Sequence, residues 1–187
     1  MARIPAVRAA DAGPMGRLVY RIARRRFGKV LEPLAVVRNH RGVFRVSLVH
    51  EGMVERSLKV LPRALADLVV YRVATVLGCS WCVDFGTMKM RLTGLDVDRL
   101  GELDEYRTSP AFDATERLAL AYADAMAATP VTVTESQVAE LTELLGVDGM
   151  IELTYLIALE NSRARFNNAL GIVDQGFSES CAVPATG

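Results

Sequence analysis

The sequence predicts an all-α protein, for three reasons. Apolar residues recur at helical spacing along nearly the whole chain, two capping boxes mark helix starts, and glycine or proline stands where the apolar runs stop. The clearest run follows Pro62, where one face repeats at intervals of three and four residues and Gly78 ends the pattern. Its apolar members are Leu65, Leu68, Val69, Val73, Val76 and Leu77.

The other helices are bounded by signals of the same kind. Asp113 with Glu116 and Thr134 with Gln137 have the spacing of capping boxes. Gly171 is the expected stop of the last helix. The stretch RGVFRVSLVH alternates like a strand, but no partner strand is evident, so we expect helix there. The predicted helices cover residues 34–57 with a break near Arg41–Gly42, 79–92, 96–103, 113–128, 134–145 and 148–170.

An amphipathic helix is also predicted near the N-terminus. Its core-facing side is expected to carry Leu18, Val19, Ile22, Ala23 and Phe27. The basic residues between them are then mostly the solvated side of the helix rather than a site for a polyanion or membrane. They are Arg17, Arg21, Arg24, Arg25, Arg26 and Lys29.

Composition narrows the class of protein. The 187 residues suffice for one domain, which we expect as an N-terminal helical extension (1–58), a core (59–175) and an irregular tail (176–187). Lysine plus arginine equals aspartate plus glutamate at 22 each, which argues against a nucleic-acid partner. No apolar run reaches the roughly 18 residues that a membrane span needs, and no signal peptide is evident. A cytoplasmic location is the expectation.

The residues that carry chemistry are Cys79 and Cys82, which form a CxxC motif in a chain with three cysteines. Residues three apart on a helix share a face, so the two sulfurs can exchange between dithiol and disulfide. If the helix starts at Cys79, free N–H groups and the helix dipole favour the reactive thiolate.

Two other interpretations of the motif stay open. Inert buried cysteines are one. A zinc site is the other, but structural zinc needs about four ligands, and the chain adds only Cys181, His40 and His50. The sequence therefore predicts a redox pair, with no metal and no other cofactor.

The segment LADLVVYRVA followed by GCSWCVDFGTMKMRLTGL, together with FDATERLALAYADAM and ENSRARFNNALG, resembles the carboxymuconolactone decarboxylase family, nearest its alkylhydroperoxidase D-like branch. The resemblance covers roughly residues 60–175. It implies a multi-helix all-α domain that assembles as a trimer or a multiple of it. It also implies a dithiol site that reduces peroxides or exchanges electrons with a dithiol partner.

The peroxidase branch places a glutamate twelve residues before the first cysteine and a histidine four after the second. Here Asp67 and Gly86 stand at these positions. Asp67 keeps the carboxylate, whereas glycine removes the proton-transferring step, which is worth about 10²- to 10⁴-fold in rate. The resemblance implies Cys82 as the attacking thiol and Cys79 as its partner, although these roles could be exchanged.

Several other residues have a structural interpretation as an alternative to a catalytic one. Asp67 could instead lie on an exposed strip of its helix, and Asp84 is expected at the solvated surface. Trp81 is expected in the core or a subunit interface, and the two histidines in ordinary structural roles. Glu160, Asn161, Arg163, Arg165 and Asn168 have no independent catalytic case.

Two functions remain. The first is a thiol-dependent oxidoreductase that uses Cys79, Cys82 and Asp67 on a peroxide or disulfide substrate. The second is a non-catalytic or redox-sensing helical oligomer that has lost peroxidase competence at Gly86.

Overall fold

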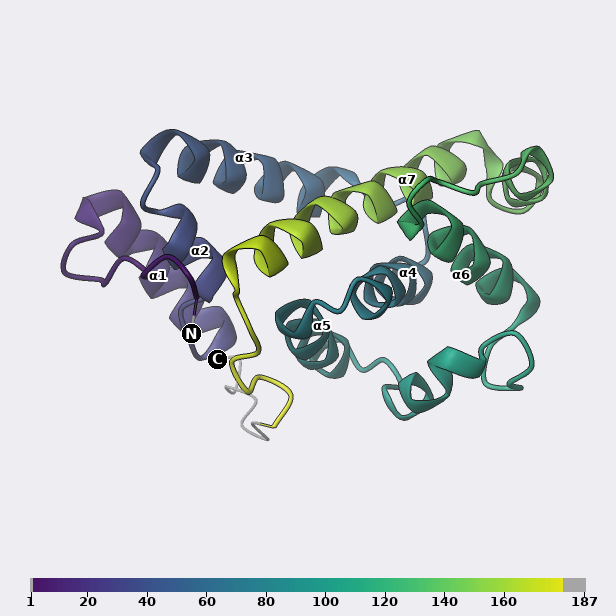
Figure 1. The fold of residues 1–187 in the computed structure, drawn as a ribbon, viewed down its shortest axis with the longest axis horizontal. Coiled ribbons are helices and arrows are strands. Elements are labelled where there is room, and N and C mark those ends of the chain that lie inside the picture. The colour runs from purple at the N-terminus through teal and green to yellow at the C-terminus, as the bar shows by residue number, and fades with distance from the viewer. Residues whose placement is uncertain (1, 180–187) are drawn as a thin grey trace.

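The computed structural model describes residues 2–179. Within that range all regular structure is helical, as predicted (Figure 1). The helices are α1 (Gly13–Phe27), α2 (Glu32–Val37), α3 (Arg41–Ser57), α4 (Arg63–Val76), α5 (Ser80–Leu92), the 3₁₀ helix η1 (Asp98–Glu105), α6 (Ala114–Ala127) and α7 (Glu135–Leu170). Cys181 lies outside the described residues.

The helix boundaries follow the local signals. Both predicted capping boxes are formed, at Asp113–Glu116 and at Thr134–Gln137. The helix expected to start at residue 134 continues to Leu170, but Gly146 interrupts it with φ 71°, a left-handed conformation that glycine adopts without strain. The helix expected over residues 96–103 is instead a 3₁₀ helix shifted by two residues, Asp98–Glu105.

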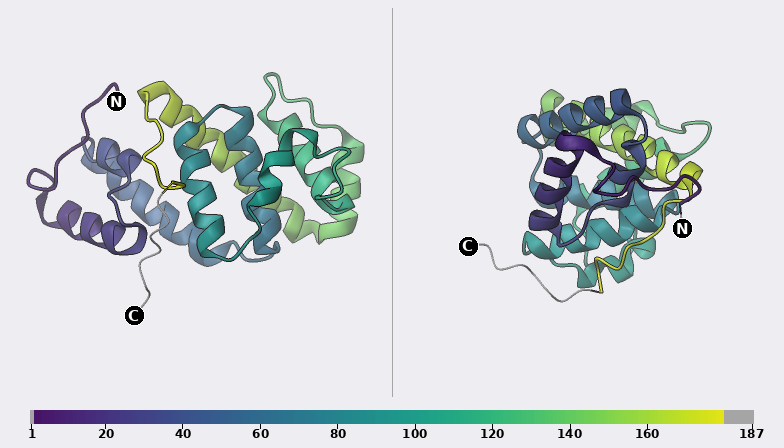
Figure 2. Two further views of the ribbon diagram at one scale, coloured as in Figure 1. Left: turned by 90° about the horizontal axis from the view of Figure 1, so that it is seen from below. Right: turned by 90° about the vertical axis from the view of Figure 1, so that its left-hand side faces the viewer.

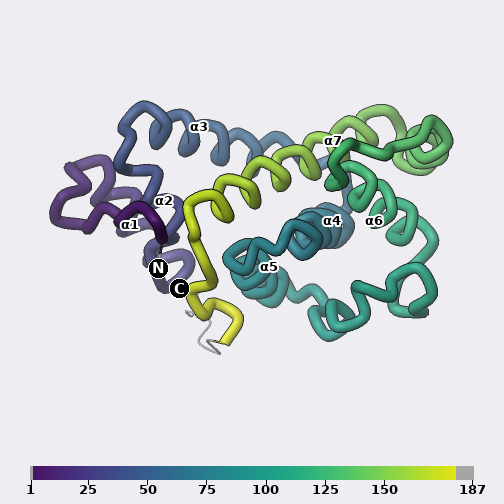
Figure 3. Tube along the Cα trace, viewed as in Figure 1, coloured from purple at the N-terminus to yellow at the C-terminus, as the bar shows by residue number. Residues whose placement is uncertain are grey.

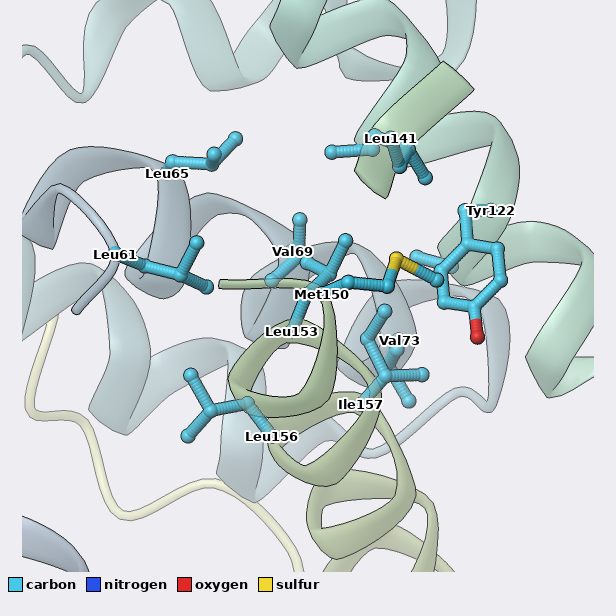
Figure 4. Close-up of a cluster of buried hydrophobic side chains, with 12 residues drawn as sticks. Leu61, Leu65, Val69, Val73, Tyr122, Leu141, Met150, Leu153, Leu156 and Ile157 are labelled. Carbon is cyan, nitrogen blue, oxygen red and sulfur yellow. The ribbon is translucent and has the colours of Figure 1, made fainter. Parts of the chain in front are cut away.

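The main core lies where α4 packs against α6 and α7 (Figure 4). The side chains that meet there include Val69 and Val73 of α4, Tyr122 of α6, and Leu153 and Ile157 of α7. A buried carboxylate positions the start of α4, since Glu152 accepts the backbone N–H groups of Val60 and Leu61 at 3.0 and 3.1 Å. Burial of a charged group is tolerated when it is hydrogen-bonded in this way.

Among residues 2–179, no helix has the length and apolar character to cross a membrane.

The N-terminal helices lie to one side of this core (Figure 2). The predicted inner face of α1 is wrong in part, because Leu18 and Ile22 are 53% and 55% exposed. The helix instead buries Tyr20, whose hydroxyl donates to the carbonyl of Val7 at 3.0 Å. Because the Tyr20 ring is buried and its hydroxyl is hydrogen-bonded, that side of α1 faces the protein. Leu18 and Ile22, on another side of the helix, therefore face solvent. The arginines of α1 are exposed, as expected.

One acid in the core is unusual. Glu160 of α7 is 4% exposed, and burial raises its pKa from 4.5 to about 7. The charges of Arg163 and Lys89 oppose this rise, whereas Glu51 of α3 adds to it. Arg163 also pairs with Glu51, so the three side chains link α7 to α3.

This raised pKa predicts a pH dependence of stability. Between pH 4.5 and 7 the folded protein holds a proton that the unfolded chain has released, so the free energy of unfolding falls as pH rises. We expect the wild type to lose up to about 3 kcal/mol relative to Glu160→Gln across this range. Urea unfolding at pH 4.5, 6 and 8 measures the difference. Glu143→Gln, at an exposed position of the same helix, should show the pH dependence of the wild type. If the free energy of unfolding of Glu160→Gln changed with pH in parallel with that of the wild type, the prediction would be contradicted.

Candidate functional site

The two cysteines occupy the start of α5. Helix α4 stops before Gly78, whose φ of 62° turns the chain sharply. Cys79 is then the N-cap residue of α5, and its Sγ accepts the backbone N–H of Cys82 at 3.3 Å. The two sulfurs form a disulfide, with the Cα atoms 5.3 Å apart. A helix start supplies unpaired N–H groups, which stabilise a negatively charged sulfur when the pair is reduced.

The sulfurs lie in a small apolar junction of three helices. Ala74 of α4 and Ala164 of α7 pack against the pair, and Cys79 and Cys82 are 0% and 9% exposed. Small side chains at both positions allow the helices to approach the disulfide closely. Of the two sulfur-bearing residues, Cys82 is therefore the one with contact to solvent.

One polar group enters this junction. The side-chain Nδ2 of Asn167 donates to Sγ of Cys82 at 3.4 Å and to Sγ of Cys79 at 3.7 Å. Asn167 is 3% exposed. A neutral donor aimed at sulfur stabilises the thiolate over the thiol. Sequence reasoning missed this residue, although an asparagine three residues after Ala164, on the buried face of an apolar helix, was a usable signal.

The next residue along α7 has a different role. Asn168 donates to the carbonyl of Leu77 at 2.7 Å and so satisfies the end of α4. The adjacent asparagines thus hold the two ends of the α4–α5 turn, one through the sulfurs and one through the backbone.

Trp81 lies in an aromatic group beside the disulfide. Its ring stacks on Phe85 with centroids 4.9 Å apart, and Phe27 of α1 meets Phe85 edge-on at 5.1 Å. The indole N–H donates to Oε1 of Gln175 at 2.8 Å. Trp81 is half-buried, and the aromatic group joins α5 to α1.

Asp84 is not at the solvated surface as expected, since it is 5% exposed. Its carboxylate accepts the backbone N–H groups of Gln175, Phe177 and Ser178 at 2.9, 3.0 and 2.7 Å. Burial alone would raise the pKa of Asp84, but these hydrogen bonds lower it below its usual range. The surface prediction failed because the partners come from a segment about 90 residues away.

The segment after α7 therefore runs against α5. Figure 3 shows it leaving α7 and passing between the N-terminal helices and α5. Gln175 is its main anchor, because its side chain also accepts from the backbone N–H of Glu32 at 2.8 Å and donates to the carbonyl of Val30 at 3.2 Å. Ser80, the first residue of α5, accepts the backbone N–H of Asp174 at 3.3 Å. These contacts hold the first turn of α5 against the segment that follows α7.

Asp67 is buried in α4 at 7% exposure rather than on an exposed strip. One of its oxygens pairs with Nε of Arg63 at 2.6 Å and the other with Nζ of Lys89 at 2.8 Å. Lys89 follows Cys82 by seven residues, about 10 Å along α5. Lys89 thus links Asp67 of α4 to α5, the helix that starts at the sulfurs.

Gly86 lies one turn after Cys82 and faces Tyr71 of α4. A Cβ atom added at Gly86 would be 3.2 Å from Cδ2 of the Tyr71 ring. Neither histidine takes the position of a relay: His40 caps α3 by accepting the N–H of Val43, and His50 lies 2.7 Å from the hydroxyl of Tyr155. Among residues 2–179, no cluster of three or more potential metal ligands is present.

Comparisons with known proteins agree with this geometry. The carboxymuconolactone decarboxylase family matches residues 47–125, which include the CxxC motif. The uncharacterized protein YnjA of Escherichia coli (strain K12) is 35% identical over 161 residues, covering 86% of this chain and 87% of that protein.

Solved structures with low sequence identity share the fold. The debrominase Bmp8 has a TM-score of 0.80 at 19% identity, covering 93% of this chain and 92% of its own. A peroxidase-related protein from Ralstonia eutropha JMP134, described as an alkylhydroperoxidase AhpD core, has a TM-score of 0.76 at 18% identity, covering 98% and 97%. Taken with the all-helical architecture, the match to the family and the 35% identity to YnjA show that the chain belongs to the carboxymuconolactone decarboxylase family.

Proposed function

We propose that the protein is a thiol-dependent oxidoreductase that cycles Cys79 and Cys82 between dithiol and disulfide. The observation that carries this proposal is the placement of both sulfurs at a helix start, bonded to one another and within reach of the Asn167 amide. Donors aimed at a sulfur lower the pKa of its thiol and improve it as a leaving group. The match to the carboxymuconolactone decarboxylase family and the fold shared with an alkylhydroperoxidase AhpD core are compatible with such a function.

The burial of the two cysteines supports Cys82 as the attacking residue, because it is 9% exposed and Cys79 is fully buried. In disulfide exchange, the Cys82 thiolate attacks a substrate disulfide and releases one substrate thiol. Cys79 then attacks the mixed disulfide, releases the second substrate thiol and forms the Cys79–Cys82 bond. The substrate gains two electrons and two protons, and a dithiol reductant resets the pair.

Peroxide reduction by the same pair is the less supported form of this chemistry. The Cys82 thiolate would attack the O–O bond of a hydroperoxide and become a sulfenic acid, and with one proton the rest of the hydroperoxide would leave as an alcohol. The Cys79 thiol would then attack the sulfenic acid, form the disulfide and release water. The relay position holds Gly86, its space is bordered by Tyr71, and both oxygens of Asp67 are engaged by cations. These features favour disulfide exchange. A redox sensor with the same reversible disulfide remains the alternative to an enzyme.

Assembly and location belong to the same proposal. Helix α3 presents Val46, Val49 and Met53 to solvent at 70%, 63% and 61% exposure, an apolar face that supports a homo-oligomer. We propose a trimer or a multiple of it, in the cytoplasm, where thiol reductants keep the cycle running.

Cysteine variants test the proposal directly. With Cys181→Ser as the background, the wild-type pair should reduce an aromatic disulfide reagent and end as Cys79–Cys82. Cys79→Ser should accumulate a stable mixed disulfide on Cys82, because the second step is removed. Cys82→Ser should react at least tenfold more slowly. Mass spectrometry of the products decides. Equal and negligible reaction in all three proteins would mean that the cysteines are inert.

The Gly86 position tests what limits peroxide reduction. Gly86→His should raise the rate of hydroperoxide consumption by about 10²-fold if a missing base is the cause. Gly86→Ala is the matched control, since it brings the same Cβ against Tyr71 without adding a base. A peroxide-coupled assay with a supplied dithiol measures both. Equal rates in the two variants would show that proton transfer at residue 86 is not the limiting feature.

A further inference from the structure

The outer surface of α1 concentrates positive charge. Together with Ala9, four of its arginines line a shallow hollow of about 350 Å³: Arg17, Arg21, Arg24 and Arg25. Helix α1 contains no acidic residue. Among residues 2–179, none of the four arginines lies within ion-pair distance of a carboxylate, whereas the neighbouring Arg26 pairs with Glu55.

The helix dipole explains only part of this arrangement. Cations in the last turn are stabilised by the helix C-terminus, which accounts for Arg24 and Arg25. Arg17 and Arg21 lie earlier in α1, where this interaction has decayed, and they add like-charge repulsion at a spacing of four residues. Four guanidinium groups around one hollow form a surface that binds carboxylates well.

An apolar strip runs beside the hollow. Met15, Leu18 and Ile22 are 43%, 53% and 55% exposed and follow one another at three and four residues along α1. A surface that combines exposed aliphatic groups with arginine is typical of protein docking sites. The chain as a whole has no net charge, so the field of this surface is local and suits a partner with a matching acidic face more than a long polyanion.

Helix α1 is linked to the redox pair through its C-terminal end. Phe27 ends α1 and contacts Phe85 of α5 at a centroid distance of 5.1 Å, and Phe85 stacks on Trp81, which stands between the two cysteines in sequence. Lys29 donates to the carbonyl of Gly176 at 3.2 Å in the segment that runs against α5. A protein bound on α1 would therefore contact a helix whose C-terminal end is packed, through Phe27, against the helix that carries the disulfide.

We propose that the arginine hollow and apolar strip of α1 dock an acidic face of the dithiol protein that reduces Cys79–Cys82. This inference rests on the proposed redox function. One partner thiolate attacks the disulfide and forms a mixed disulfide. The second partner thiol then breaks that bond, so the partner becomes a disulfide while two electrons and two protons pass to Cys79 and Cys82. Charge attraction raises the rate of encounter.

Two synthetic dithiol peptides test the docking. Both carry Cys-x-x-Cys; one is flanked by four glutamates and the other by four glutamines. Trp81 is the only tryptophan, so its fluorescence reports reduction of the adjacent disulfide in a Cys181→Ser background. At low salt the glutamate peptide should reduce the pair about tenfold faster than the glutamine peptide. The advantage should vanish near 1 M salt.

Variants then locate the effect. Replacing Arg17, Arg21, Arg24 and Arg25 by glutamine should abolish the preference for the glutamate peptide. The control replaces four other exposed basic residues, Arg41, Arg45, Arg56 and Lys59, by glutamine, and should retain the preference. Dithiothreitol, a small dithiol with no acidic face to dock, should reduce all the proteins at similar rates. If the fourfold α1 variant does not fold, Arg17→Gln/Arg21→Gln should still lower the preference at least threefold.

Several results would overturn the docking proposal. They are a preference retained in the α1 variants, equal loss in the control, or tighter binding of the wild type to phosphatidylglycerol vesicles or single-stranded RNA than to the glutamate peptide. A disulfide that dithiothreitol does not reduce would instead defeat the redox function. In that case the fluorescence anisotropy of a labelled, cysteine-free glutamate peptide tests the docking by itself. Binding that depends on the four arginines would support the docking proposal, and the absence of such binding would overturn it.

Discussion

The rest of the site depends on where α5 starts. Gly78 breaks the chain between two helices, Cys79 caps the second, and Asn167 reaches the sulfurs from the end of α7. Because α7 also supplies the core that packs against α4, the helix that stabilises the fold positions the polar group at the sulfurs. The disulfide is thereby held between a helix N-terminus and a side-chain amide. Both features stabilise a thiolate once the bond is reduced.

Local signals predicted most of this architecture. The two capping boxes, the break at Gly78 and the interruption at Gly146 depend on neighbours within a few residues, so the sequence contains what is needed to place them. The same holds for Cys79 at the helix start, since the glycine precedes it directly. The CxxC motif could therefore be found, and placed at a helix start, from its neighbours in the sequence alone.

Residues whose environment comes from distant segments could not be placed in this way. Asp84 has the character of a surface residue, but the chain after α7 returns to it with three backbone donors. Asn167 acquires its contact with the sulfurs only through tertiary packing. Leu18 and Ile22 fit a helical apolar face, yet the anchoring of Tyr20 decides which side of α1 is buried. In each case a long-range contact overrides a sound local pattern.

The family explains the fold better than it explains the chemistry. Gly86 stands at the position of the relay histidine, and the space beside it is bordered by Tyr71. Stabilisation of a thiolate therefore depends on the helix start and on Asn167. Asp67 is tied to two cations, and the buried Glu160 lies two turns before Asn167 on α7. The N-terminal helices add a feature outside the core, an arginine-rich surface on α1.

The central claim is that Asn167 and the start of α5 make the reduced cysteines reactive. The pH dependence of alkylation of the reduced protein in a Cys181→Ser background tests it most directly, with Asn167→Ala beside the adjacent control Asn168→Ala. The account predicts that the reactive thiol has a pKa below the usual value of about 8.5 and that only Asn167→Ala raises it. Thiols that react only after unfolding, or a pKa that neither variant changes, would contradict it.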